Sequence, residues 1–163
     1  MEFKQAGKGA EDFIKLRGCL EIALLDAKTM EVLEHRKIDN TVVTSGRSYV
    51  LSRIVSASPQ TDTINAIAVG TSSNAPATGD VLLTSEALRI SIASFVTSGL
   101  TNNPPSWQAQ CTFLTNQANT TLGEAGLFNA TGSNVQTMLS HVTFSTISKT
   151  TSNTLAISYT ISN

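Results

Sequence analysis

The residues that could carry acid–base chemistry are few beyond residue 40. Four acids occur there: Asp62, Asp80, Glu86 and Glu124. A glycosidase needs two carboxylates at a set separation in a cleft. Asp62 and Asp80 fall in turns, where an Asp commonly binds local backbone. Glu86 precedes Arg89 by three residues, which predicts an ion pair on a helical turn. No catalytic pair is therefore expected.

Glu124 stands between two glycines in the stretch GEAGLF. We predict a structural role, because no partner acid, base or metal ligand lies near it in the sequence. Gly123 and Gly126 would permit backbone angles closed to other residues. Glu124 would accept hydrogen bonds from nearby backbone or pair with a base such as Arg89. We expect Glu124→Ala to lower stability without abolishing any chemistry.

Other chemical signatures are weak. The only histidines, His35 and His141, fall in a charged edge strand and a Thr/Ser-rich strand, and solvated or locally bonded rings are expected rather than a metal site. There is no Gly-x-Ser-x-Gly elbow, Walker loop or Gly-x-Gly-x-x-Gly motif. We therefore predict no catalytic residue, metal or cofactor. Cys19 and Cys111 are interpreted as buried free thiols.

Charge is concentrated at the start of the chain. Residues 1–40 hold seven of the eleven Lys and Arg and eight of the twelve Asp and Glu, whereas residues 41–163 contain 40 Ser and Thr. A net charge of −1 with no basic stripe argues against nucleic acid and anionic membranes as partners. A hydroxyl-rich surface suits contact with other protein, because burying a hydroxyl costs far less than burying an ion.

Most of the chain shows the alternation of half-buried strands. Alternating apolar residues occur at 16–26, 89–96, 107–113, 142–144 and 155–161, a charged strand at 31–38, and a buried strand at 64–70. Residues 44–57 change to helical spacing, with Thr44 or Ser45 as a cap. Residues 71–80 form a loop, and residues 81–88 a short helical turn or an irregular lead-in.

These elements predict an all-β fold. We expect seven or eight strands in an antiparallel β-sandwich, of which a jelly roll is one form, with one short helix near residues 45–57. Residues 1–15 are interpreted as an extended N-terminal arm, with disorder as the alternative, and residues 16–163 as a single domain. No apolar run approaches the length of a membrane helix.

Several motifs resemble one family in their order along the chain. AVGTSSNAPATGDVLLTSEALR (68–89) contains a Pro-containing loop and an acid-x-x-Arg ending, and residues 123–162 contain GEAGLFNA, a TML strand and Phe-x-x-Ile-x-Lys. Together they resemble virion structural proteins of tailed bacteriophages. Seven residues are candidates for structure or assembly: Pro76, Arg89, Gly123, Glu124, Gly126, Phe128 and Lys149.

The resemblance implies a non-enzymatic virion protein on the particle surface, on the head rather than the tail. A capsid decoration (cement) protein is favoured, a homotrimer whose partners are itself and the major capsid protein or other virion proteins. The alternative is a tail, baseplate or fibre component that recognises a host-surface glycan. Trp107, Tyr49 and Tyr159 would then be sugar platforms, although their apolar faces favour core positions.

Overall fold

A computed structural model describes residues 15–55, 63–132 and 137–163 of the chain. Nine strands, one α-helix and one short 3-10 helix follow one another in the described residues: β1 (Arg17–Asp26), β2 (Val32–Val42), α1 (Thr44–Val55), β3 (Ala66–Gly70), β4 (Glu86–Ser91), β5 (Ser94–Val96), η1 (Ser98–Thr101), β6 (Ser106–Phe113), β7 (Thr121–Phe128), β8 (Met138–Ser148) and β9 (Asn153–Ser162). The prediction of an all-β fold with one short helix is confirmed.

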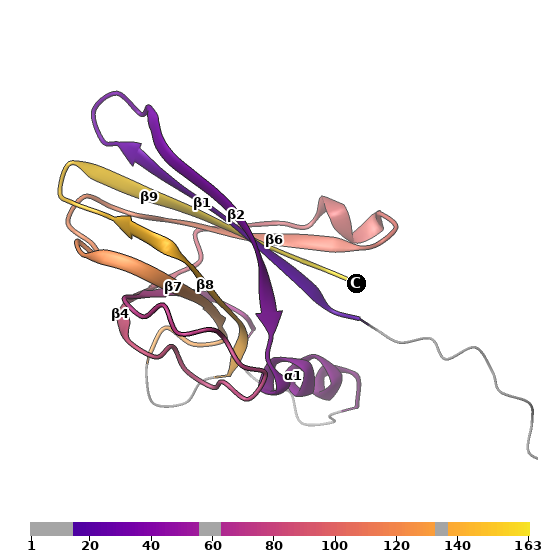
Figure 1. Cartoon of the computed structure of the whole chain (residues 1–163). Helices are drawn as coiled ribbons and strands as arrows, with labels where there is room; N and C mark the ends of the chain where they lie inside the picture. The colour runs from indigo at the N-terminus through magenta and orange to yellow at the C-terminus, as the bar shows by residue number, and fades with distance from the viewer. Residues whose placement is uncertain (1–14, 56–62, 133–136) are drawn as a thin grey trace, which may run out of the picture.

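All the strands belong to one continuous antiparallel sheet in the order β4-β3-β7-β8-β2-β1-β9-β6-β5. β2 belongs to both parts of this sheet, because it pairs with β1 along its length and with β8 only through Thr41 and Val42 at its end. We call β2-β1-β9-β6-β5 the β1 half and β8-β7-β3-β4 the β7 half. The sheet curls, so the halves face each other in Figure 1.

The main core fills the space between the two halves. β1 alternates buried and half-buried residues, with Leu20, Ile22 and Leu24 inward. The closing strand β9 alternates in the same way: Leu155, Ile157, Tyr159 and Ile161 are all buried. Both sets belong to one cluster that also contains Val69 of β3 and Leu127 of β7. The alternation expected for these two strands is confirmed.

A second, smaller apolar cluster lies on the opposite face of the β7 half. Ala66 and Ala68 alternate along β3 with Ile67 and Val69, and only the latter two belong to the main core. The second cluster also contains Leu83, so the chain between β3 and β4 covers this face. The outer face of the β7 half is therefore covered, and that covering positions the site described below.

The helix α1 packs against the same half through a close backbone contact. A Cβ added to Gly46 would lie 2.3 Å from the carbonyl oxygen of Leu139 in β8, so only glycine fits there. The Ser45 hydroxyl donates to the Met138 carbonyl oxygen (3.0 Å), which ties the start of the helix to β8. The Thr44 N–H donates to the Thr78 oxygen (2.7 Å) and links the helix to the 71–85 loop.

Three sequence-based assignments were wrong. Residues 89–96 form two strands rather than one, since β4 pairs with β3 whereas β5 pairs with β6 at the far edge of the sheet. The chain crosses between the halves at Ile92 and Ala93, and the apolar alternation runs through the crossing. Nine strands replace the seven or eight expected, and Glu86 begins β4 instead of lying on a helical turn.

Some expectations fall outside the described residues. The proposed N-terminal arm lies there except for Lys15, as do Asp62 and the expected end of the helix beyond Val55. Among the described residues, no helix combines the length and apolar character needed to cross a membrane. Cys19 and Cys111 are free thiols, and burial raises the pKa of Cys111 to about 12. Cys19 is only half-buried.

Candidate functional site

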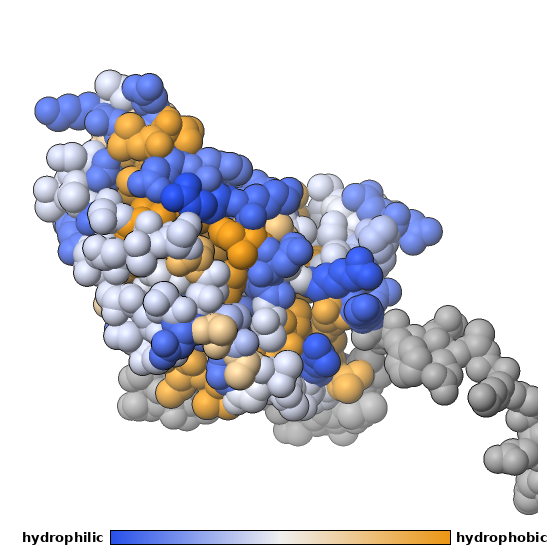
Figure 2. Space-filling model, in the orientation of Figure 1, coloured by the Kyte–Doolittle hydropathy of each residue, from blue (hydrophilic) through white to orange (hydrophobic). Residues whose placement is uncertain are grey.

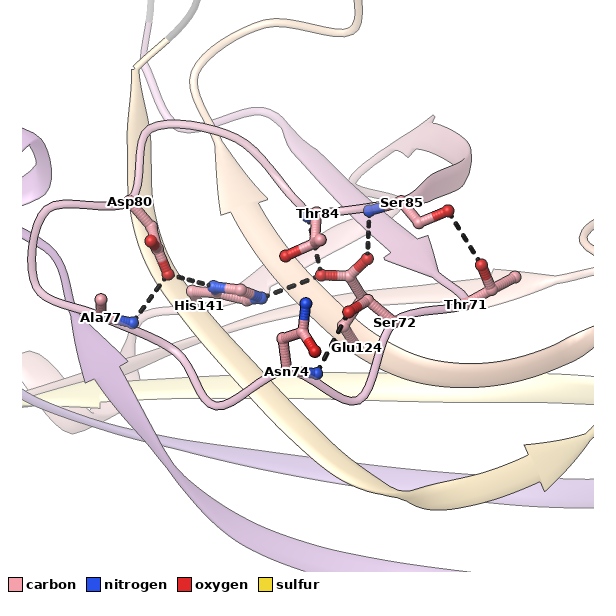
Figure 3. A network of polar contacts seen from close by, with 9 residues as sticks. All are labelled: Thr71, Ser72, Asn74, Ala77, Asp80, Thr84, Ser85, Glu124 and His141. Carbon is pink, nitrogen blue, oxygen red and sulfur yellow. Dashed lines mark hydrogen bonds and ion pairs between the residues drawn. The ribbon is translucent and has the colours of Figure 1, made fainter.

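The only acid of β7, Glu124, lies beneath the 71–85 loop and is fully buried. Its carboxylate accepts a hydrogen bond from the Thr84 N–H at Oε2 (3.0 Å) and one from the Ser85 N–H at Oε1 (2.7 Å). Figure 3 shows the carboxylate pointing from the strand to these two loop amides. Two charge-assisted hydrogen bonds to backbone fix the end of the loop on the sheet.

A histidine from the neighbouring strand completes the contact. His141 Nε2 lies 3.0 Å from Glu124 Oε2, and His141 Nδ1 lies 2.7 Å from Asp80 Oδ2. Asp80 also accepts a hydrogen bond from the Ala77 N–H (2.8 Å). We call Asp80, His141 and Glu124 the clasp, because they connect the middle of the loop to β8 and β7 (Figure 3).

Each contact of the His141 ring with a carboxylate needs a proton between the two atoms. An imidazole nitrogen without hydrogen is an acceptor, and so is an ionised carboxylate. Both contacts of His141 are hydrogen bonds only if a proton lies between each ring nitrogen and its carboxylate.

Asp80 is the member of the clasp that reaches solvent, with 28% of its side chain exposed. Burial acts to raise the pKa of its carboxyl, but the hydrogen bonds from the Ala77 N–H and from His141 outweigh burial and lower the pKa below its usual range. Asp80 is therefore ionised at neutral pH.

The arrangement is suited to holding the loop rather than to attacking a substrate. The His141 side chain is 2% exposed and that of Glu124 is fully buried. Both ring nitrogens of His141 are engaged by carboxylates, so neither is available to activate a hydroxyl or thiol. Within the described residues, no group of three or more His, Cys, Asp and Glu side chains could hold a metal ion.

The two glycines beside Glu124 do not have the conformations expected of them. No described glycine has a positive φ, so Gly123 and Gly126 are ordinary strand residues. They are needed for space instead. A Cβ on Gly123 would lie 2.7 Å from the Ser72 carbonyl oxygen of the covering loop, and one on Gly126 would lie 2.8 Å from the Phe128 ring. The glycines let the loop lie directly on the strand.

Arg89 does not pair with Glu124. It forms a two-pronged ion pair with Glu86, with Arg89 Nε 3.1 Å from Oε1 and Nη2 2.6 Å from Oε2. The predicted pair is confirmed, but a bulge in β4 rather than a helical turn makes it possible, since the β3–β4 register shifts between Leu88 and Glu86. The guanidinium stacks 3.7 Å above the Phe128 ring and donates to the Ala130 oxygen (3.1 Å).

The two remaining candidates also contact connecting segments. Lys149 is buried, and its Nζ donates to the Leu114 carbonyl oxygen (2.7 Å) and to Asn119 Oδ1 (3.0 Å) in the connection between β6 and β7. Burial lowers the pKa of Lys149. Pro76 is half-buried in the 71–85 loop, next to the Ala77 amide that binds Asp80.

The structure thus places Glu124 in contact with residues for which the sequence predicted other roles or none. His141 is buried rather than solvated, and Asp80 binds it in addition to the local backbone. One signal was available: the alternation of Val142 and Phe144 places both on one face of the strand and His141 on the other. Glu124 is a diagonal neighbour of His141 on the paired strand, because Gly126 lies opposite His141. Nothing in the sequence identifies Thr84 and Ser85, which contribute backbone amides.

Comparisons with known proteins add no relative. No protein-family model, curated protein or solved structure matches the chain. Any assignment of function consequently depends on the geometry and the sequence motifs.

Proposed function

We propose that the chain is a non-enzymatic structural protein of a tailed-bacteriophage particle. A homotrimeric decoration protein that binds the head shell is the most specific form of this proposal. The motif resemblance supports the class. The motif residues Arg89, Glu124 and Lys149 each form a hydrogen bond with the backbone of a connecting segment, which is a structural role.

The observation that carries the proposal is the distribution of charge. Seven described residues beyond residue 40 are charged: Arg47, Arg53, Asp80, Glu86, Arg89, Glu124 and Lys149. Five of them, all but the two arginines of α1, make the internal contacts described above. Little charge is left on the outer surface of residues 63–163, and Figure 2 shows broad pale areas between the blue ones. Such a surface loses little solvation energy on contact with another protein.

An open edge of the sheet offers a place for that contact. β5 is the last strand in the sheet order, and Phe95, Val96 and Leu100 beside it are 47%, 39% and 53% exposed. We call these three residues the β5 edge patch. An exposed apolar edge strand invites pairing with another chain, and soluble proteins usually protect such edges with charge or cover. We propose that a second copy covers this edge in the trimer.

The assembly state tests this directly. Size-exclusion chromatography with light scattering should give a trimer, and Val96→Asp should give a folded monomer. Leu51→Asp is the matched control, because Leu51 is exposed by 56% on α1 and should leave the trimer intact. A chain that stays monomeric at every concentration would contradict the trimer. The particle assignment has its own test: antibodies against the chain should label the heads of purified phage particles in electron micrographs.

The proposed arm supplies a second test on particles. Removing residues 1–15 should weaken attachment to emptied heads while the sheet domain remains folded. Equal binding by the truncated chain would remove the anchoring role from the arm. Labelling of tails rather than heads would favour the tail, baseplate or fibre alternative. Tyr159 and Tyr49 could not act as sugar platforms in that case, because both are buried.

A further inference from the structure

An open hollow of about 400 Å³ lies on the outer face of the β1 half. Its floor is formed by Ala23 of β1 and Ala156 of β9, which lie directly opposite each other. Adjacent strands are about 4.8 Å apart, so two neighbouring alanines leave a shallow apolar floor the width of a small ring. The volume falls in the lower part of the range of small-molecule sites, about 300–1,000 Å³.

Polar side chains surround this floor in register. His35 lies opposite Ala23 on one side, and Thr112 lies opposite Ala156 on the other. In the next row of the sheet, Ser158 of β9 lies between two partners: Glu21 of β1 is opposite it on one side and Gln110 of β6 on the other. The lining therefore combines a carboxylate, an imidazole, an amide and hydroxyls around two methyl groups.

The charge in the hollow is already balanced. Lys37 Nζ lies 2.8 Å from Glu21 Oε1, which leaves Oε2 to accept a further hydrogen bond. The hydrogen bond from Lys37 lowers the pKa of Glu21, so the carboxylate is ionised at neutral pH. An anionic ligand would be repelled by Glu21, and a cationic ligand would compete with Lys37. The hollow favours a neutral molecule with many hydroxyls and one apolar face.

We propose that this hollow binds one pyranose ring of a neutral carbohydrate. The C–H face of the ring would rest on the methyl groups of Ala23 and Ala156. Its hydroxyls would donate to Glu21 Oε2 and exchange hydrogen bonds with the Gln110 amide and the Ser158 hydroxyl, groups that can each act as donor or acceptor. The site goes beyond an assembly role and does not depend on the trimer.

Chemical-shift mapping of the full chain by NMR tests the proposal with three probes: methyl glucoside, methyl galactoside and N-acetylglucosamine. At least one should shift the amides around Ala23, Ala156 and Ser158 in a saturable way in the millimolar range. Glucuronic acid, which is anionic, should bind at least about tenfold more weakly. The absence of saturable shifts at the hollow with all three neutral probes would overturn the proposal.

Matched variants locate the binding. Ala156→Leu fills the floor and should weaken the bound sugar by about tenfold or more, whereas Thr160→Leu, on the same outer face of β9 but outside the hollow, should not. Glu21→Gln should weaken binding by about tenfold, because a charged acceptor is lost. Lys37→Gln breaks the same ion pair but keeps the carboxylate, so binding should stay within about twofold. A folded Ala156→Leu chain with unchanged affinity would also overturn the proposal.

Discussion

The two outer faces of the curled sheet differ in how they deal with polar groups. On the β7 half, the 71–85 loop covers Glu124 and His141, and each buried polar atom of the clasp has a hydrogen-bonding partner. On the β1 half, no described segment covers the outer face, where β9 and β6 present Ser, Thr and Gln and the ion pair of Glu21 with Lys37 is exposed. The β7 half thus buries its charged groups under the loop, whereas the β1 half leaves its few charged groups in solvent.

The covered face departs from the usual distribution, in which charged side chains face water. Burying a carboxylate is tolerable only when other polar groups replace its hydration. The Thr84 and Ser85 amides and the His141 ring do so for Glu124. The open face has no buried carboxylate held in this way, so its side chains should contribute little to the stability of the isolated chain. The covered face should be sensitive to single substitutions and the open face tolerant of them.

Glu124→Ala should have the largest effect. It leaves the Thr84 and Ser85 amides and His141 without their acceptor, and removing one partner from a buried charged contact costs about 3–5 kcal/mol. Urea unfolding followed by circular dichroism would measure the loss.

Glu21→Ala is the matched substitution on the open face. The pair of Glu21 with Lys37 is exposed, and such pairs contribute about 0–1 kcal/mol. Equal losses of stability in the two variants would mean that the covering loop does not distinguish the two faces. Glu124→Gln should fall between them, because one amide oxygen can still accept.

Gly123→Ala should have the next largest effect, about 1–3 kcal/mol, because the added methyl group would meet the Ser72 carbonyl oxygen and push the loop from the strand. Hydrogen exchange should show faster exchange at the Thr84 and Ser85 amides.

Gly79→Ala is the control within the same loop. A Cβ at Gly79 meets nothing within 4 Å, and its φ is not positive. This substitution should be neutral or slightly stabilising, since alanine restricts the unfolded chain. If Gly79→Ala lost as much stability as Gly123→Ala, the loop would be sensitive to any added side chain. The effect of Gly123→Ala could then not be attributed to a specific contact with β7.

Acid should weaken the covered face more than the open one. The folded pKa of Asp80 lies below the unfolded value of about 3.9, so between the two values the unfolded chain binds more protons and stability rises with pH. The contribution of Asp80 is complete above the unfolded pKa and is lost as pH falls through the folded pKa.

Asp80→Asn should therefore be less stable than the parent at neutral pH, and the difference should shrink on acidification. Glu21 also has a lowered pKa, but its side chain is 42% exposed, so Glu21→Gln should show a smaller change with pH. Thermal unfolding between neutral pH and acid measures both. A parent–Asp80→Asn difference that is independent of pH would contradict the role of Asp80 as an ionised member of the clasp.

The sequence predicted the open face better than the covered one. Period-two alternation identified the inward residues of β1, β6 and β9. A strand with one face in solvent and one in the core must alternate polar and apolar residues. β7 is buried on both faces and does not alternate: Leu122 to Phe128 are all buried. The covering loop buries the outer face of β7. A loop that folds back on a sheet produces no periodic pattern of apolar residues in the sequence.

The clasp could be predicted only in part, for the same reason. A structural role for Glu124 followed from its lack of a neighbouring catalytic partner, but its true partners lie 17 to 40 residues away in the chain and meet only through the fold. The motif GEAGLF indicated an unusual position, and the glycines were interpreted through backbone angles. Their actual role is to admit a second layer of backbone, which depends on what lies opposite and cannot be read from the strand alone.

Ser158→Ala should have the smallest effect. Ser158 lies at the centre of the open face, between Glu21 and Gln110 on the adjacent strands, and surface substitutions of this kind stay within about 0.5 kcal/mol. Urea unfolding of the isolated chain at low concentration measures it. A loss above about 1.5 kcal/mol would mean that the Ser158 hydroxyl is an essential partner in the folded chain. The β1 half would then hold its outer residues as tightly as the β7 half does, and the difference between the two faces would not lie in how strongly each depends on its polar groups.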